Sequence, residues 1–235
     1  MNPTHDSQFQ TLDDDHNPAP PTSGSLRGAM ALAIIGGPLG YLVGALLAPA
    51  IHDSGALTIA ANRAANPVAN DIHVAAFMIA AFLLPVSVGG LAWLAHPAAP
   101  RLATVGGVLG VVGWLPYSAL TALDDLARTM GDMPPGTDYA GLLDRFTNDP
   151  VMNGYLIVYI IGHLLTYVLL GIALRRARVV PRWASWALVA SSPLTLAVFV
   201  LPTRPVALGY VALGLLAVGS LPVARAMVTR PLSRA

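Results

Sequence analysis

The sequence contains no cysteine, no lysine and no glutamate. Without cysteine, the chain has no disulfide bond, thiolate metal site or thiol nucleophile. Without lysine, it cannot form a Schiff base, which excludes a retinal-binding rhodopsin. All 13 basic residues are arginine and all 12 acidic residues are aspartate.

Charge is scarce. Only 11% of the residues are charged, and 55% belong to the hydrophobic set, whereas a soluble domain carries roughly 25% charged residues. The mean hydropathy of +0.63 agrees with a chain that resides in lipid. The net charge of +1 gives no reason to expect nucleic acid as a partner.

Long apolar stretches make up most of the chain. Each has about 19 residues or more, enough to cross roughly 30 Å of hydrocarbon as a helix. The stretches cover residues 28–50, 68–95, 102–123, 151–174, 183–201 and 206–227. Because the backbone in lipid must satisfy its own hydrogen bonds, we expect an all-α, polytopic bundle of six transmembrane helices that contacts the lipid bilayer.

The six predicted spans form one transmembrane domain over residues 28–228. The two ends of the chain lie outside it. Residues 1–27 are polar and include the run Asp13-Asp14-Asp15, so we expect a disordered tail. Residues 229–235 form a short C-terminal tail.

Two sequence signals mark helix starts. Asn66-Pro67 and Asp149-Pro150 each place a capping side chain before a proline suited to the first helical turn. They predict where the second and fourth spans begin.

The arginines predict the orientation. With the N-terminus inside, nine lie on the cytoplasmic side and four outside (Arg63, Arg128, Arg145 and Arg204). This distribution obeys the positive-inside rule, and six spans place both termini in the cytoplasm. The long connections 51–67 and 124–150 then lie outside and are acidic, and residues 138–146 are expected to form a short amphipathic helix there.

Glycines repeat every four residues at Gly36, Gly40 and Gly44, and again at Gly106 and Gly110. This spacing clears one helix face for close approach of another helix. It suits contacts within the chain, and also a helix partner or a homo-oligomer.

Tyr155, Tyr159, His163 and Tyr167 are spaced by four on the fourth span, so we expect one stripe with His163 near mid-membrane. A polar residue at that depth usually faces the bundle interior or a water-filled cavity. His163 is therefore either part of a ligand, proton-relay or cofactor site, or a neutral, packed histidine.

The third span carries a second stripe, which consists of Trp114, Tyr117, Thr121 and Asp124, with Asp125 adjoining it. It is either an aromatic packing face that ends in a solvated aspartate pair or the wall of a substrate path. The sequence does not show whether the two stripes face each other.

Histidine and carboxylate also gather near the outer surface. His52 and Asp53 follow the first span, and Asp71 and His73 lie near the start of the second. These residue types bind zinc, copper or iron, but no established metal-site spacing is present. A bis-histidine haem between His73 and His163 would need both rings at a similar depth, whereas the spacing places them more than roughly 10 Å apart in depth. No cofactor is predicted, although haem or a divalent metal stays an alternative.

The layout resembles a broad bacterial group of uncharacterised small integral membrane proteins with about six helices. The residues that carry the resemblance are His52, Asp71, His73 and the sequence Pro181-Arg182-Trp183-Ala184. The resemblance covers about residues 28–228 and implies a multi-pass protein of the bacterial plasma membrane. It implies no particular activity.

Three function classes follow. The favoured one is a non-enzymatic membrane protein that binds or passes a small, cationic ligand through an outward-facing polar cavity. In that hypothesis His163, Tyr159 and Tyr155 line the base, and Asp71, His73, Asp124 and Asp125 form the rim. The alternatives are a membrane enzyme or metal or haem carrier, and an accessory protein that acts through helix contacts.

Overall fold

The computed structural model describes residues 24–49, 54–134, 138–201 and 205–230. All regular secondary structure in these ranges is α-helical. The helices are α1 (Gly24–Leu47), α2 (Gly55–Ala64), α3 (Pro67–Ala95), α4 (Pro100–Trp114), α5 (Tyr117–Asp132), α6 (Tyr139–Thr147), α7 (Pro150–Ala177), α8 (Arg182–Val200) and α9 (Val206–Thr229). Six segments are long and apolar enough to cross a membrane, with α4 and α5 counting as one. The predicted polytopic helical bundle is confirmed.

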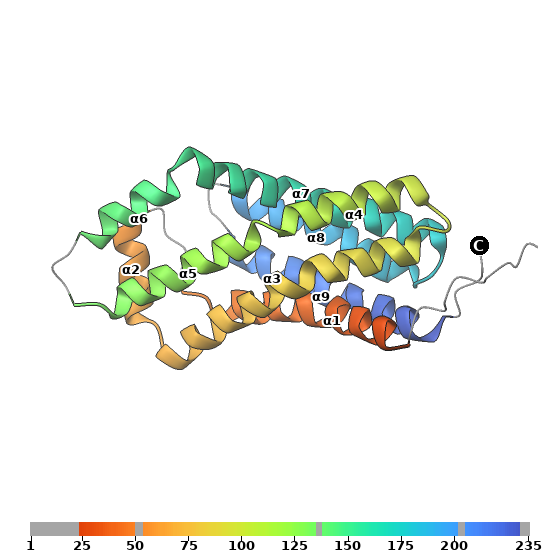
Figure 1. The fold of residues 1–235 in the computed structure, drawn as a ribbon, viewed down its shortest axis with the longest axis horizontal. Helices are drawn as coiled ribbons and strands as arrows, with labels where there is room; N and C mark the ends of the chain where they lie inside the picture. The colour runs from red at the N-terminus through yellow and green to blue at the C-terminus, as the bar shows by residue number, and fades with distance from the viewer. Residues whose placement is uncertain (1–23, 50–53, 135–137, 202–204, 231–235) are drawn as a thin grey trace, which may run out of the picture.

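The long helices run side by side, and α2, α6 and the second half of α5 gather at one end of the bundle (Figure 1). Helix α1 packs against α3 and α9, α4 packs against α7, and α8 packs against α7 and α9. We call the end with α2 and α6 the acidic end. The opposite end, where α7 ends and α8 begins, is the basic end.

The side chains divide between a core and a lipid-facing surface. Large apolar residues such as Leu84, Leu91 and Leu170 are fully buried between the helices. Others, among them Leu32 and Phe82, are about 70% exposed on the outer faces of the long helices (68% and 70%). A broad apolar surface of this kind is unfavourable in water, so it matches contact with a lipid bilayer.

Both predicted helix starts are present. The Asn66 side chain accepts a hydrogen bond from the Ala69 backbone N–H, and Pro67 occupies the first turn of α3. The Asp149 side chain accepts from the Val151 N–H at 2.8 Å, and Pro150 opens α7. In each case a side-chain oxygen satisfies a backbone donor that has no partner within the helix.

The third span differs from the prediction, which placed one helix over residues 102–123. The helix is interrupted at Leu115 and Pro116, and α5 continues to Asp132. Pro116 lacks the N–H that would continue the helical ladder at this position. Helix α5 extends beyond the predicted limit, and Ala127 and Met130 in its second half pack against α2 and α6.

A small second core holds the acidic end together. Ile59 of α2, Ala127 and Met130 of α5 and Leu143 of α6 pack against one another. Helix α6 (Tyr139–Thr147), with Asp138 as its cap, confirms the predicted short helix over residues 138–146. An Asp144 carboxylate oxygen accepts from the Gly55 N–H at 2.6 Å and so ties α6 to the start of α2.

The glycine repeats serve contacts within the chain. A Cβ atom on Gly44 would lie 2.2 Å from the Phe77 ring, and one on Gly40 would lie 3.0 Å from the Ala76 carbonyl, both on α3. Gly106 and Gly110 face Leu170 and Thr166 of α7 in the same way. The predicted close approach is confirmed between neighbouring helices of one chain.

The predicted tails lie largely outside the described residues. Helix α1 begins at Gly24, four residues before the predicted boundary, and α9 ends at Thr229. His52 and Asp53 also lie outside the described ranges.

Candidate functional site

An aromatic cluster occupies the bundle interior below the acidic end. Tyr41, Phe77, Trp114, Tyr117 and Tyr159 come from five helices, α1, α3, α4, α5 and α7. Neighbouring ring centroids lie 5.2–5.6 Å apart. Most of these contacts are tilted or edge-to-face, the geometries that aromatic pairs prefer. The cluster joins the two predicted stripes, which face each other across α4, α5 and α7.

Within this cluster, α5 and α7 are joined by a stacked pair, and α1 and α7 by a hydrogen bond. The Tyr117 and Tyr159 rings are 5.5 Å apart and inclined by only 17°. The Tyr41 and Tyr159 hydroxyls lie 2.5 Å apart and share a hydrogen bond. Tyr159 is thereby held by both partners in one orientation.

A cavity of about 580 Å³ lies above the cluster, toward the acidic end. Tyr41, Tyr117 and Tyr159 contribute to its wall, together with side chains from α2, α3, α6, α8 and α9. The volume lies within the range of about 300–1,000 Å³ that is usual for small-molecule sites. Most of its wall is aromatic or aliphatic, with a few polar groups among them.

Asp124 is the acidic side chain of α5 that lines this cavity. It is partly buried, and its carboxylate makes no hydrogen bond or ion pair with any residue that the structure describes. A carboxylate withdrawn from water normally acquires a partner, because desolvation of the charge is unfavourable. Asp124 is therefore the cavity's ligand-binding candidate.

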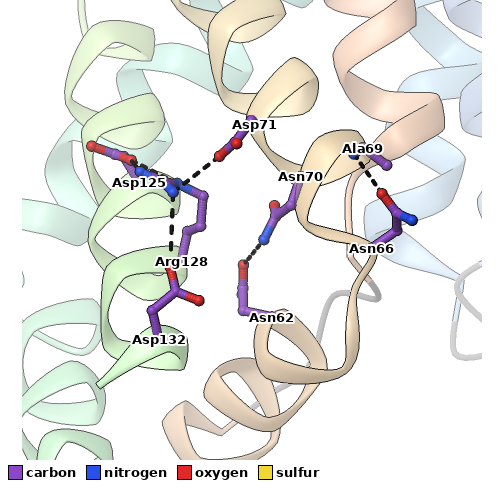
Figure 2. A network of polar contacts seen from close by, with 8 residues as sticks. All are labelled: Asn62, Asn66, Ala69, Asn70, Asp71, Asp125, Arg128 and Asp132. Atoms are coloured by element: carbon purple, nitrogen blue, oxygen red, sulfur yellow. Dashed lines mark hydrogen bonds and ion pairs between the residues drawn. The ribbon is translucent and has the colours of Figure 1, made fainter. Parts of the chain in front are cut away.

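Asp71 and Asp125 were predicted to form part of the cavity rim, and the structure places them elsewhere. Both bind the Arg128 guanidinium, Asp125 at 2.8 Å and Asp71 at 3.0 Å, while Asp132 lies 3.9 Å away (Figure 2). Neither Asp71 nor Asp125 lines the cavity. Arg128 neutralises part of the acidic end and leaves Asp124 unpaired.

The contacts between α2 and α3 lie beside this network. The Asn70 amide donates to the Asn62 side-chain oxygen at 3.0 Å (Figure 2). Asn62 also lines the cavity. The hydrogen bond therefore holds the Asn62 side chain, a polar group of the cavity wall, in place relative to α3.

His73 lines the cavity, as predicted, but it is 4% exposed rather than at the surface. Its Nδ1 lies 2.8 Å from the Gly44 carbonyl oxygen. Since a carbonyl can only accept, Nδ1 must carry the proton, and in the neutral ring Nε2 is then an acceptor. The ring also contacts Phe77 edge-on at 4.6 Å.

His163 was predicted to line the cavity base, and the structure instead seals it beneath the cluster. It is 3% exposed, does not line the cavity, and lies under Trp114 and Tyr159 at ring distances of 5.1 and 4.4 Å. Nδ1 donates to the Tyr159 carbonyl at 2.5 Å. Nε2 has no hydrogen-bond partner among the described residues.

The other two tyrosines of the predicted stripe have different surroundings. Tyr167 is buried below His163 and faces Trp114 at 6.3 Å. Tyr155 is 47% exposed on the surface of α7 and does not line the cavity. The prediction that Tyr155 contributes to the cavity base is not supported by this placement.

The residues proposed as metal or haem ligands are not brought together. No group of three or more histidine and aspartate side chains with metal-site geometry occurs in the described ranges. His73 lines the cavity and His163 does not, so the two histidines of the haem alternative share no common space.

Sequence reasoning missed two residues of the site, Tyr41 and Phe77. Tyr41 lies between Gly40 and Gly44, a region taken only as a packing face. A tyrosine in an otherwise apolar span was the available signal, because a hydroxyl in lipid requires a partner. Phe77 carries no such signal, since phenylalanine is common on any membrane helix.

Neither a scan against protein-family models nor searches of curated proteins and of solved structures found a match to this chain.

Proposed function

We propose that the chain is a multi-pass protein of the bacterial plasma membrane that binds or passes a small organic cation through the aromatic cavity. The observation that carries the proposal is the Asp124 carboxylate, which lines an aromatic cavity and has no partner among the described residues.

The composition of the cavity supports a cationic ligand. A positive charge beside Asp124 would offset the cost of removing the carboxylate from water. The faces of Tyr41, Tyr117 and Phe77 would add cation–π attraction, which grows when the cation is desolvated. A neutral ligand would gain only the apolar part of this interaction.

The arginine distribution supports an outward-facing cavity. Nine arginines lie on the side that the positive-inside rule assigns to the cytoplasm. The cavity lies toward the other, acidic end, which would then face the outside, with both termini in the cytoplasm. We also propose that the chain belongs to the broad bacterial group of small integral membrane proteins with about six helices that its layout resembles.

The test uses the purified full-length chain in detergent with benzyltrimethylammonium as the cation probe. Isothermal titration calorimetry should detect saturable binding to the native chain. Asp124→Asn should weaken it at least tenfold, because the change removes the Coulomb attraction between the carboxylate and the cation, which is about 4 kcal/mol for charges roughly 4 Å apart at an effective dielectric constant of about 20. Asp125→Asn is the matched control, since its carboxylate already binds Arg128 outside the cavity.

The uncharged analogue neopentylbenzene separates charge recognition from apolar partitioning. It should bind more weakly than the cation and should not distinguish Asp124→Asn from the native chain. Equal affinity of the cation for the two aspartate variants would contradict the proposal. So would equal affinity of the native chain for the cation and the uncharged analogue.

A further inference from the structure

A second cavity lies between α7 and α8 at the basic end. Its volume is about 500 Å³, and it is lined by residues of the last two turns of α7 and the first two of α8. It lies at the opposite end of the bundle from the aromatic cavity, so the inference drawn from it is independent of the proposed function.

The local backbone explains how this cavity forms. Helix α7 ends at Ala177, and the residue that caps it, Arg178, adopts a left-handed conformation with φ 52°. Helix α8 begins after Pro181 and passes so close to Gly171 that a Cβ there would lie 2.6 Å from Val189 and 2.9 Å from the Ser185 carbonyl. The two helices touch at Gly171, and the cavity lies beside this contact.

The cavity wall carries an excess of positive charge. Arg175, Arg176 and Arg178 line it, and none of their guanidinium groups makes an ion pair or hydrogen bond within the described ranges. The aspartates in those ranges are all in or beside α3, α5, α6 and the first turn of α7, at the acidic end. No carboxylate of the described chain balances the three arginines.

Ser185 provides a second, independent indication of a ligand. Its side chain lines the cavity and is 1% exposed, yet its hydroxyl has no hydrogen-bond partner among the described residues. Leaving a buried hydroxyl unpaired costs about 1–3 kcal/mol. An acceptor oxygen placed in the cavity would receive this hydrogen bond and would also attract the three guanidinium groups.

Two tryptophans indicate the source of that oxygen. Trp186 lines the cavity and is 56% exposed, and Trp183, one turn earlier on the same helix, is 52% exposed. Exposed tryptophan on a membrane helix is enriched at the level of the lipid headgroups. Basic pockets between membrane helices at this level suit anionic headgroups.

We propose that this cavity binds the phosphate-bearing headgroup of an anionic membrane lipid. Arg175, Arg176 and Arg178 compensate the charge, the Ser185 hydroxyl donates to a phosphate oxygen, and Trp186 contacts the glycerol and upper acyl region. The proposal commits to lipid rather than free phosphate because Trp186 provides an apolar part of the wall that inorganic phosphate would not use.

The experiment measures retention of phosphatidylglycerol by the purified full-length chain with native mass spectrometry. Phosphatidylcholine, which carries the same phosphate but no net charge, is the comparison lipid. The native chain should retain phosphatidylglycerol at least tenfold more strongly. The double variant Arg175→Gln, Arg176→Gln should lose this preference.

Two further variants keep the test specific. Arg101→Gln removes an exposed arginine in the first turn of α4, outside the cavity, and should keep the preference. Ser185→Ala should weaken phosphatidylglycerol binding several-fold without lowering the unfolding temperature, because it removes a hydroxyl that has no partner in the protein.

Three outcomes would overturn the proposal. The first is equal retention of the two lipids by the native chain. The second is an equal loss in the Arg101→Gln variant and the double variant, which would reduce the effect to overall charge. The third is displacement of phosphatidylglycerol by an equimolar amount of inorganic phosphate, which would identify the ligand as free phosphate.

Discussion

Asp124 and Asp125 are neighbours in sequence, and their surroundings separate them. Asp125 lies on the face of α5 that meets Arg128, whereas Asp124 points one helical step away and lines the aromatic cavity. Successive residues of a helix are rotated by about 100°, so adjacent carboxylates cannot share a face. We predicted both aspartates at the cavity rim, because the sequence does not show which helices lie beside each face of α5.

The tyrosine stripe of α7 shows how far periodicity alone can predict a site. A spacing of four residues advances about 40° beyond a full helical turn, so a stripe of four members drifts around the helix. Tyr159, His163 and Tyr167 stay within the bundle, and Tyr155 at the outer end of the stripe is exposed. The spacing predicted the face correctly for three residues and failed for the fourth.

This difference between two tyrosines is testable. Tyr159→Phe removes the hydrogen bond to the Tyr41 hydroxyl and should lower the free energy of unfolding by about 1 kcal/mol. Tyr155→Phe is the matched control on the same helix and should leave stability unchanged, since that hydroxyl makes no bond within the described residues. Equilibrium unfolding of the variants in detergent gives the comparison. Equal effects of the two changes would count against the described packing of α7.

At the scale of elements, the crossing of α4 and α7 fixes how the two aromatic stripes meet. The helix backbones touch at Gly113 and Gly162, where a Cβ on Gly162 would lie 2.5 Å from the Gly113 Cα. Backbone atoms cannot yield as a flexible side chain can, so this contact tolerates no side chain on either helix. The spacing of Gly106 and Gly110 predicted a close approach, but Gly113 and Gly162 lie outside that repeat and were not identified.

Gly162→Ala should therefore destabilise the bundle by about 1–3 kcal/mol, the usual cost of overpacking. Gly154→Ala on the same helix is the control, because nothing lies within 4 Å of the added methyl group. It should be neutral or stabilising by up to about 1 kcal/mol, since alanine favours helix more than glycine does. A thermal unfolding series in detergent measures both. If Gly162→Ala were as stable as Gly154→Ala, α4 and α7 would not cross as described.

The break between α4 and α5 is an element-scale feature that the sequence indicated only in part. Pro116 lies inside one of the long apolar stretches, and membrane helices often tolerate such a proline with a kink. The charged second half of α5 was taken as a loop, because hydropathy measures polarity and not helix formation. Its helix is stabilised by the packing of Ala127 and Met130 on α2 and α6, a contact between distant segments.

At the scale of the whole molecule, charge is divided between the two ends of the bundle. The acidic end holds the described aspartates and the aromatic cavity, and the basic end holds the arginine-lined cavity between α7 and α8. Apolar stretches and helix starts were predictable because lipid imposes strict requirements on the backbone. Each cavity is formed by side chains from more than one helix. A single sequence does not show which helices pack against each other, so it does not predict the cavities.

The central claim is that the chain crosses a membrane so that these two ends lie on opposite sides. The protein has no cysteine, so single cysteines introduced at exposed positions report location directly. Arg145→Cys on α6 marks the acidic end, and Ala98→Cys between α3 and α4 marks the basic end.

The deciding measurement is labelling of these two variants in intact bacterial cells with a membrane-impermeant maleimide. The account predicts that Arg145→Cys is labelled in intact cells and that Ala98→Cys is labelled only after the membrane is permeabilised. Labelling of both cysteines from the same side would contradict the transmembrane arrangement, and labelling of Ala98→Cys alone in intact cells would reverse the proposed orientation.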